Sequence, residues 1–293
     1  MVGQVLLMKK KHRIAVAWAQ DANTIGAINL SVRNGFVDAI MIGQPDKISE
    51  VCTANGIDPG NFTIISCDNE ALASETAVQM VKLGDADIVM KGLVGTDIFL
   101  KAIMDRNRGL MQPDAVLSYV GAIEIPEYNK LLFVTDPAVI PYPGLKQKIA
   151  MTAYALEMAR KFGIGNPKVA LIGASEKGSS HFLYSSDYAE IKSMGAMGKF
   201  GKCTIDGPLD LYLACDKKSI EIKGVSTPVA GDADILLFPS LEACNPFYKS
   251  LMLFSHGELG GMIMGTDKPV VLMSRSESEK SKYYCIALAC LMD

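Results

Sequence analysis

Short apolar runs rich in β-branched residues alternate with longer amphipathic segments along most of the chain. The first runs, which indicate buried strands, lie at 13–18, 39–42, 62–65 and 88–90. The segments between them, at 22–34, 46–55 and 70–84, have the spacing and the alanine, leucine and methionine content of helices. Buried strands that alternate with helices are typical of a parallel sheet covered on both faces. The pattern therefore predicts an α/β protein.

The pattern changes near the middle of the chain. After a predicted helix at 97–106, strands at 116–124 and 130–135 are separated by only a short turn, which predicts an antiparallel hairpin. The stretch 135–144 then contains three prolines and a glycine, which makes it the best candidate for a domain junction. A helix is expected at 145–163 and a last helix at 278–292. Between these helices a second series of strands is expected at 168–172, 202–205, 235–238, 261–264 and 270–273.

Composition and charge narrow the function classes. A chain of 293 residues suggests two domains, or one large one. With a net charge of -3 it offers no global polycation for nucleic acid, and it has no run of about 18 apolar residues for a membrane span. Seven scattered cysteines without a CxxC pair indicate free thiols in a reducing compartment, and three widely separated histidines form no local metal motif. We expect a cytoplasmic protein that binds neither nucleic acid, membrane nor metal.

Candidate chemistry lies in the loops that follow the strands, since ligands of open α/β sheets bind beyond the carboxyl ends of strands. The first such loop, 90–97, contains Lys91, Gly92, Gly95 and Thr96. Two glycines let the backbone approach a ligand closely, Lys91 supplies charge, and Thr96 can cap a helix or donate a hydrogen bond. The loop suits an anionic group such as phosphate, although it lacks the P-loop pattern GxxxxGK[ST]. An ordinary turn with Thr96 or Asp97 as the helix cap is the other interpretation.

The second loop, 274–281, opens the last predicted helix. It carries Arg275 beside several hydroxyl groups, an arrangement that suits a phosphate or an oxyanion. Glu277 and Glu279 are well explained without a ligand, as acidic residues that stabilise the positive end of a helix. Arg275 has the wrong sign for that position, so it is the stronger candidate for a functional residue.

Other loops give weaker signals. Asp206-Gly207-Pro208 is a turn signature, Glu242 and Asn245 are compatible with a helix start, and the loop 173–175 lacks the GxGxxG spacing of a dinucleotide site. The chain has no GxSxG elbow and no cysteine with an adjacent histidine. These observations argue against a standard Rossmann dehydrogenase and against a hydrolase with a serine or cysteine nucleophile.

At these loops the sequence resembles the phosphate acetyl/butyryltransferase family, and its butyryltransferase branch more closely than the acetyl-specific one. The blocks that carry the resemblance stand in one order along most of the chain, at 86–94, 131–136, 206–209, 229–237, 242–243, 248–249 and 269–275. The resemblance implies an acyltransferase that interconverts a short-chain acyl-CoA plus phosphate with an acyl phosphate plus coenzyme A. It implies coenzyme A as a co-substrate, no tightly bound cofactor, and a homodimer or a higher homo-oligomer.

The implied fold has two α/β domains of the isocitrate/isopropylmalate dehydrogenase-like type with the active site in the cleft between them. The last strand and helix return to the first domain, so the expected domains are 1–141 plus 267–293 and 142–266. On this model, Arg275 binds the phosphate and the developing oxyanion, and Ser274 donates a hydrogen bond to the leaving thiolate. The residues expected to bind substrate are Lys91, Gly92, Thr96, Lys101, Ser118, Asp136 and Asn245.

Three departures from the family pattern leave details open. Acetyl-specific relatives have an aspartate, proposed as the base, where this chain has Ser281, so that either Glu277 or Glu279 takes the role or phosphate needs no strong base. Lys101 stands where many relatives have arginine, which keeps the charge but not bidentate recognition. Segment 176–186 matches poorly in a region that helps receive coenzyme A in relatives. A hydroxy-acid dehydrogenase of the same fold and a non-catalytic acyl-CoA or acyl-phosphate binding protein are the alternative functions.

Overall fold

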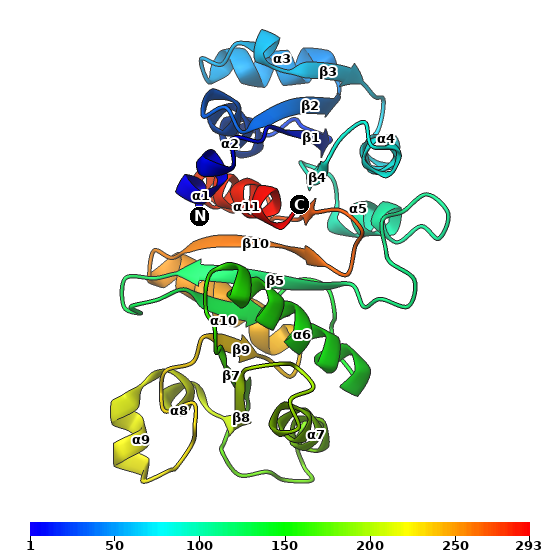
Figure 1. Cartoon of the computed structure of the whole chain (residues 1–293). Helices are drawn as coiled ribbons and strands as arrows, with labels where there is room; N and C mark the ends of the chain where they lie inside the picture. Colours follow the sequence, from blue (N-terminus) through cyan, green and yellow to red (C-terminus); the bar gives the residue numbers. More distant parts are fainter. The chain divides into compact units, whose positions relative to one another are not determined.

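The computed structural model describes residues 1–293, which divide into two compact units (Figure 1). Unit 1 comprises Met1–Ala115 and Leu259–Asp293, and unit 2 comprises Val116–Glu258. These limits differ from the predicted boundaries at 141/142 and 266/267. Strand pairing accounts for the difference, because β6 (Leu132–Thr135) pairs with β9 (Ile235–Leu237) of unit 2, whereas β10 (Glu258–Met264) pairs with β11 (Val270–Val271) of unit 1.

Unit 1 contains strands in the order β3-β2-β1-β4-β11-β10. The bounds not yet given are β1 (His12–Ala17), β2 (Val37–Gly43), β3 (Thr63–Ser66) and β4 (Ile88–Lys91). Every pair in this order is parallel except the β10–β11 pair, which is antiparallel. The side chains of β4 are all buried, as the continuous apolar run predicts. Strand β11 and the last helix belong to unit 1.

Apart from α1, the helices of unit 1 follow its strands and lie near the predicted ranges. They are α1 (Val2–Met8), α2 (Ala22–Arg33), α3 (Pro45–Ala54), α4 (Glu70–Leu83), α5 (Thr96–Ile103) and α11 (Glu279–Met292), with a 3₁₀ turn at Pro59–Asn61. Asp21, Asn69 and Ser278 cap α2, α4 and α11 by accepting a hydrogen bond from a backbone N–H group of the first turn. Helices α2 and α11 pack against each other, as do α4 and α5. Only α1, a short helix without a side-chain cap, has no counterpart in the prediction.

Unit 2 repeats the arrangement of a parallel sheet with one antiparallel strand. Its order is β5-β6-β9-β7-β8, in which β5 (Ser118–Glu124) is antiparallel to β6 and the pairs β6–β9, β9–β7 and β7–β8 are parallel. Strands β7 and β8 span Lys168–Ile172 and Thr204–Leu209. The predicted hairpin of β5 and β6 is therefore confirmed.

The helices of unit 2 were predicted less completely. They are α6 (Leu145–Lys161), α7 (Ser185–Ala196), α8 (Leu211–Cys215), α9 (Lys217–Lys223) and α10 (Leu241–Phe254). Only α6 had been predicted as a complete helix, and it packs against β5, β6 and β9. Helix α10 begins at the cap Ser240 and contains Pro246, a residue that weakens the helical signal in the sequence.

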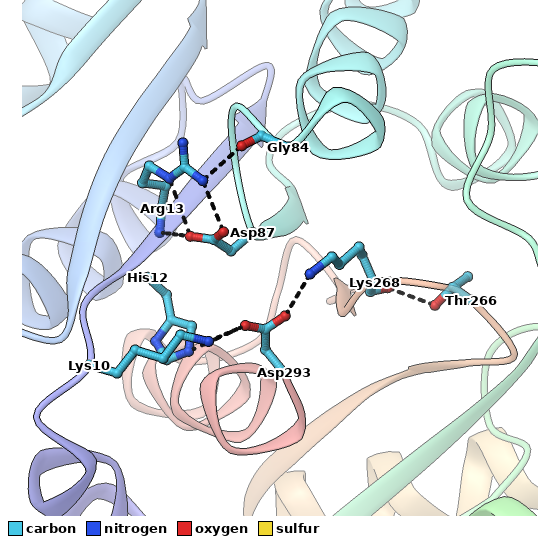
Figure 2. A network of polar contacts seen from close by, with 8 residues as sticks. All are labelled: Lys10, His12, Arg13, Gly84, Asp87, Thr266, Lys268 and Asp293. Carbon is cyan, nitrogen blue, oxygen red and sulfur yellow. Dashed lines mark hydrogen bonds and ion pairs between the residues drawn. The ribbon is translucent and has the colours of Figure 1, made fainter.

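A network of charged side chains joins three parts of unit 1 (Figure 2). Asp293, after α11, forms ion pairs with Lys10 at 2.5 Å and with Lys268 at 3.2 Å. Arg13 on β1 donates to the carboxylate of Asp87, at 3.1 Å from Nη2 to Oδ1, and to the carbonyl oxygen of Gly84. The network ties the start of β1 to the end of α11 and to the loop before β11.

Two further expectations concern the state of the cysteines and membrane-spanning segments. All seven cysteines are free thiols, and Cys52, Cys67, Cys244, Cys285 and Cys290 are buried. None of the helices combines the length and the apolar character needed to cross a membrane.

Candidate functional site

Three neighbouring strands of unit 1 end at one edge of the sheet. In the pairing register, Ala17 of β1 lies opposite Lys91 of β4, and Met90 of β4 lies opposite Val271 of β11. The loops that follow these parallel strands therefore start side by side and lead into helices α2, α5 and α11. Helix N-termini present unpaired N–H groups and a partial positive charge, so this edge favours an anion.

Gly92 holds two of these loops together. Its backbone N–H donates to the carbonyl oxygen of Ala17 at 2.9 Å, and the N–H of Leu93 donates to that of Trp18 at the same distance. A Cβ atom at position 92 would lie 2.6 Å from both carbonyl oxygens, too close for any side chain without a backbone shift. Gly92 thus makes a close approach to the backbone of the loop after β1, and its close approach to a ligand stays a prediction.

Lys91 places a positive charge at the end of β4. Its side chain is 3% exposed, and its ammonium group donates to the carbonyl oxygen of Gly92 at 3.2 Å. Burial is the main cause that lowers the pKa of Lys91 to about 8, and the positive charges of Arg275 and Lys282 lower it further. Asp21 and Glu70 oppose this shift. A cation that is buried among other cations gains most from a bound anion.

Lys282 and Asp21 belong to the same cluster, although neither is among the residues predicted from the sequence. The Lys282 ammonium donates to Asp21 Oδ1 at 3.0 Å and to Thr24 Oγ1 at 3.1 Å, and its residue is 3% exposed. Asp21 Oδ1 also accepts from the N–H of Thr24, which makes it the cap of α2. One signal in the sequence indicates Lys282: it is a cation in the first turn of a helix, where a positive charge is unfavourable. The same argument identifies Arg275.

The loop before α11 carries the predicted catalytic residues. Arg275 is exposed and makes no hydrogen bond or ion pair within the chain, while the half-buried Ser274 has its hydroxyl 3.0 Å from that of Ser276. Glu277 is buried, and its carbonyl oxygen accepts from Asn23 Nδ2 of α2 at 3.2 Å. The loop is therefore fixed to α2 while the Arg275 guanidinium stays available.

Ser281 has a clear structural role in the first turn of α11. It is 1% exposed, and its hydroxyl oxygen accepts from the backbone N–H of Leu259 on β10 at 3.0 Å. A serine hydroxyl engaged in this way does not serve as a general base. The two glutamates proposed in its place lie in different settings, since Glu277 is buried and Glu279 is exposed beside Gly26 of α2.

Helix α5 places the other predicted cations and hydroxyls of unit 1. Thr96 is exposed as its first residue, after Gly95, whose N–H donates to the Glu70 carboxylate at 2.9 Å. Lys101 lies in the last turn, in a groove of about 370 Å³ between α4 and α5 that Ile98, Val78 and Arg108 also line. Lys101 thus lines a groove between two helices, whereas Lys91 is buried at the end of β4.

Three predicted residues come together in unit 2, after β6. The buried Asp136 carboxylate accepts from Ser118 Oγ at 3.1 Å and from the N–H groups of Tyr119, Ala138, Val139 and Ile140. Asn245 of α10 donates to the carbonyl oxygen of Pro137 at 2.8 Å. Burial raises the pKa of Asp136, and these donors oppose that shift. Both carboxylate oxygens are occupied by protein donors, so Asp136 shapes the turn at 136–140.

Comparisons with known proteins show the family to which the chain is similar. A family model described as phosphate acetyl/butaryl transferase matches residues 70–290. The phosphate butyryltransferase of Clostridium acetobutylicum is 38% identical over 97% of this chain and 94% of its own length. The phosphate acetyltransferase of Thermotoga maritima is 32% identical over 96% of this chain and 95% of its own. Among solved structures, a branched-chain phosphotransacylase from Enterococcus faecalis V583 is similar, with a TM-score of 0.82, 29% identity and coverage of 96% and 98% of the two chains.

Proposed function

Because the chain belongs to the phosphate acetyl/butaryl transferase family, we propose that it catalyses the reversible transfer of a short acyl group between coenzyme A and inorganic phosphate. One observation supports this function beyond the family match. Lys91, Arg275 and Lys282 gather positive charge at the carboxyl ends of β4 and β11, where the blocks that resemble the family also lie. Such a cluster suits a phosphate dianion and the charge that develops during acyl transfer.

In the proposed reaction a phosphate oxygen attacks the thioester carbonyl of acyl-CoA. A carbon–oxygen bond forms, the carbon–sulfur bond breaks, and the thiolate of coenzyme A leaves. Arg275 binds the phosphate and stabilises the oxyanion of the tetrahedral intermediate, and Ser274 donates a hydrogen bond to the leaving thiolate. Lys91 and the start of α5 at Thr96 bind the phosphoryl group. Orientation of two anionic substrates in one site supplies much of the rate enhancement.

The proton balance of this reaction does not require a strong base. The second pKa of a phosphate monoester is near 6. That of inorganic phosphate is higher and close to neutrality, so at neutral pH a substantial share of the substrate is already dianionic. Glu277 is the proposed acceptor for the remaining monoanion, since Ser281 is occupied by the N–H group of Leu259. Coenzyme A enters as a co-substrate, and no tightly bound cofactor takes part.

The remaining parts of the proposal rest on the family resemblance. Ser118, Asp136 and Asn245 contribute to substrate binding through the turn at 136–140, and Lys101 contributes a further positive charge. The two domains are of the isocitrate/isopropylmalate dehydrogenase-like type. The protein works in the cytoplasm as a homodimer or a higher homo-oligomer, and its free cysteines suit a reducing compartment.

Release of free thiol tests this function directly. The assay uses acetyl-, butyryl- and isobutyryl-CoA, with and without inorganic phosphate, and a dye that reports the thiol of coenzyme A. Phosphate-dependent release is expected, and the order of the three rates identifies the preferred acyl chain. Binding of coenzyme A without phosphate-dependent release would instead support a non-catalytic binding protein.

Replacement of Arg275 tests the assignment of the site. Because a preorganised donor to an oxyanion is worth roughly 100- to 1000-fold in rate, Arg275→Ala is expected to lower kcat by about that factor. Arg33→Ala, at the exposed far end of α2, serves as the control and keeps normal turnover. An Arg275→Ala variant with nearly normal turnover would contradict the assignment.

A further inference from the structure

Lys282 and Asp21 form a buried ion pair that no step of the proposed reaction uses. The pair joins the first turn of α11 to the cap of α2, at 3.0 Å between Nζ and Oδ1. The side chain of Lys282 is 3% exposed and that of Asp21 is 18% exposed. The second carboxylate oxygen of Asp21, Oδ2, is buried and accepts no hydrogen bond. The pair is therefore fixed in place and shielded from solvent.

A pair of this kind is a poor device for stability alone. Removal of two charges from water costs several kcal/mol per ion. Well-packed apolar residues in the place of a buried ion pair therefore often stabilise a protein as well as the pair does, or better. Here the apolar alternative was available, because α11 buries Cys285, Ile286 and Leu288 further along. A buried cation at this place therefore points to an electrostatic task.

The surroundings of Lys282 indicate which task it performs. Asp21 and Thr24 occupy two of the three hydrogen-bond donors of its ammonium group. Its positive charge acts on Lys91, whose ammonium makes one hydrogen bond to the protein. Lys282 lies in the first turn of α11, the helix that follows the loop 274–278, so the ion pair also anchors the end of that loop to the start of α2.

We propose that Lys282 is a positioning residue of the transferase, whose buried pair with Asp21 holds a second positive charge beside Lys91 for the phosphate group of the substrate. This inference rests on the proposed function and adds a residue to its site. Asp21 fixes the Lys282 ammonium and keeps it from folding away, while Lys91 and Arg275 contact the phosphate. Lys282 thus acts through the electrostatic field of the site, in which its charge also acts on Lys91.

The test compares Lys282→Met with Lys282→Arg. Loss of the charge is expected to raise the KM for phosphate about tenfold, the size expected when a charged interaction is lost, with a smaller change in kcat. Lys282→Arg keeps the charge and is expected to recover most of the affinity. Lys280→Met, an exposed lysine of the same helical turn, is the matched control and is expected to leave the KM for phosphate unchanged.

The pH profile separates this role from a purely structural one. The charged groups that act on Lys91 are Arg275, Lys282, Asp21 and Glu70. Removal of Lys282 takes away a positive neighbour, so the pKa of Lys91 rises and the basic limb of the phosphate-affinity profile moves to higher pH. A folded Lys282→Met protein with the wild-type KM for phosphate and the wild-type pH profile would overturn the inference.

Two further measurements keep the test decisive. If Lys282→Met does not fold because Asp21 is left unpaired, the double variant Asp21→Asn, Lys282→Met removes both charges and retains the helix cap. Calorimetric binding of inorganic phosphate follows the site without turnover. A wild type that binds phosphate but releases no thiol would refute the proposed function while the binding comparison still tests Lys282. Equal phosphate binding by the wild type and a folded Lys282 variant would refute the role of Lys282.

Discussion

The Lys91 amine shows how a single residue is placed for binding at the expense of stability. Its pKa of about 8, against an ordinary 10.5, means that the folded protein resists the charged form. As the pH falls from 10.5 to about 8, the unfolded chain takes up the proton before the folded protein does. At neutral pH Lys91 is charged in both states, and the full cost of its buried charge opposes folding. The shift corresponds to roughly 3 kcal/mol, part of which a bound phosphate would recover.

We therefore predict opposite effects of Lys91→Met on stability and on activity. At pH 7 the variant should unfold a few degrees higher than the wild type, because a buried charge is replaced by an apolar side chain of similar length. Its KM for phosphate should rise at least tenfold, as expected for loss of a charged donor. Thermal melts and thiol-release kinetics measure the two effects. A melting temperature below that of the wild type would contradict the electrostatic account.

At the residue scale, local signals identified part of the cluster and long-range pairing hid the rest. Lys91 and Arg275 could be predicted because Lys91 stands at the end of a strand and Arg275 in the loop after one, each with a charge that a simple turn does not need. Asp21 resembles any helix cap, and its partner Lys282 is 261 positions away along the chain. Nothing local in either segment indicates that the two side chains meet.

At the scale of elements, Ser281 connects helix α11 to strand β10. Its hydroxyl accepts from the N–H of Leu259, and both groups are buried. Ser281→Ala should therefore lower the free energy of unfolding by about 1–3 kcal/mol, since it leaves a buried donor unpaired. Because the serine is not the base, kcat should change little, by less than about threefold on the scale of general-base catalysis.

Chemical denaturation and thiol release measure this pair of effects. Ser193→Ala is the matched control, because Ser193 is an exposed serine of helix α7 whose replacement should have little effect on unfolding. A loss of kcat by a factor of 100 or more, without loss of stability, would show instead that Ser281 takes part in the chemistry.

Helices and strands were predicted correctly where the burial of the segment and the periodicity of its sequence agree. Most of the parallel strands were identified because both of their faces are covered and their sequences are apolar. The edge strand β3 is an exception: a buried strand was predicted there, but Thr63 and Ser66 are exposed and Ile64 and Ile65 are only half-buried. Helices α7 to α10 have weaker signals: α7 contains Gly195 and lacks a side-chain cap, and α8 is only 5 residues long. Helix α10 had a recognisable start in Ser240, which accepts from the N–H of Ala243, but Pro246 conceals its continuation.

At the scale of the molecule, strand pairing decides the limits of the two units. The proline-rich stretch 135–144 was the predicted junction, yet it lies inside unit 2. Its turn is organised by Asp136, which accepts hydrogen bonds from Ala138, Val139 and Ile140. Proline and glycine indicate a turn reliably. They do not indicate whether the strands on either side belong to one sheet, because pairing between distant segments decides that.

The acid stability of unit 1 depends on His12 at the start of β1. Its side chain is fully buried, its two ring nitrogens make no hydrogen bond, and Nε2 lies 3.6 Å from Asp293 Oδ2 (Figure 2). Burial is the main cause that lowers the pKa of His12 below 6.5, the charge of Lys10 lowers it further, and Asp293 and Asp87 oppose the shift. Below pH 6.5 the unfolded chain therefore takes up a proton that the folded protein resists, and stability falls as the pH falls.

We predict that unfolding between pH 7 and pH 5 is governed largely by this histidine. The pKa of Asp293 and of Asp87 is lowered below 3.8, so their ion pairs persist throughout this window. The wild type should lose up to about 2 kcal/mol of unfolding free energy across it. His12→Leu should be as stable as the wild type at pH 7 and lose much less at pH 5, because no buried imidazole remains to be protonated. Thermal melts at both pH values test this, with the exposed His181→Gln as the control, which should keep the wild-type acid loss. An equal loss in His12→Leu would assign the acid sensitivity to other groups.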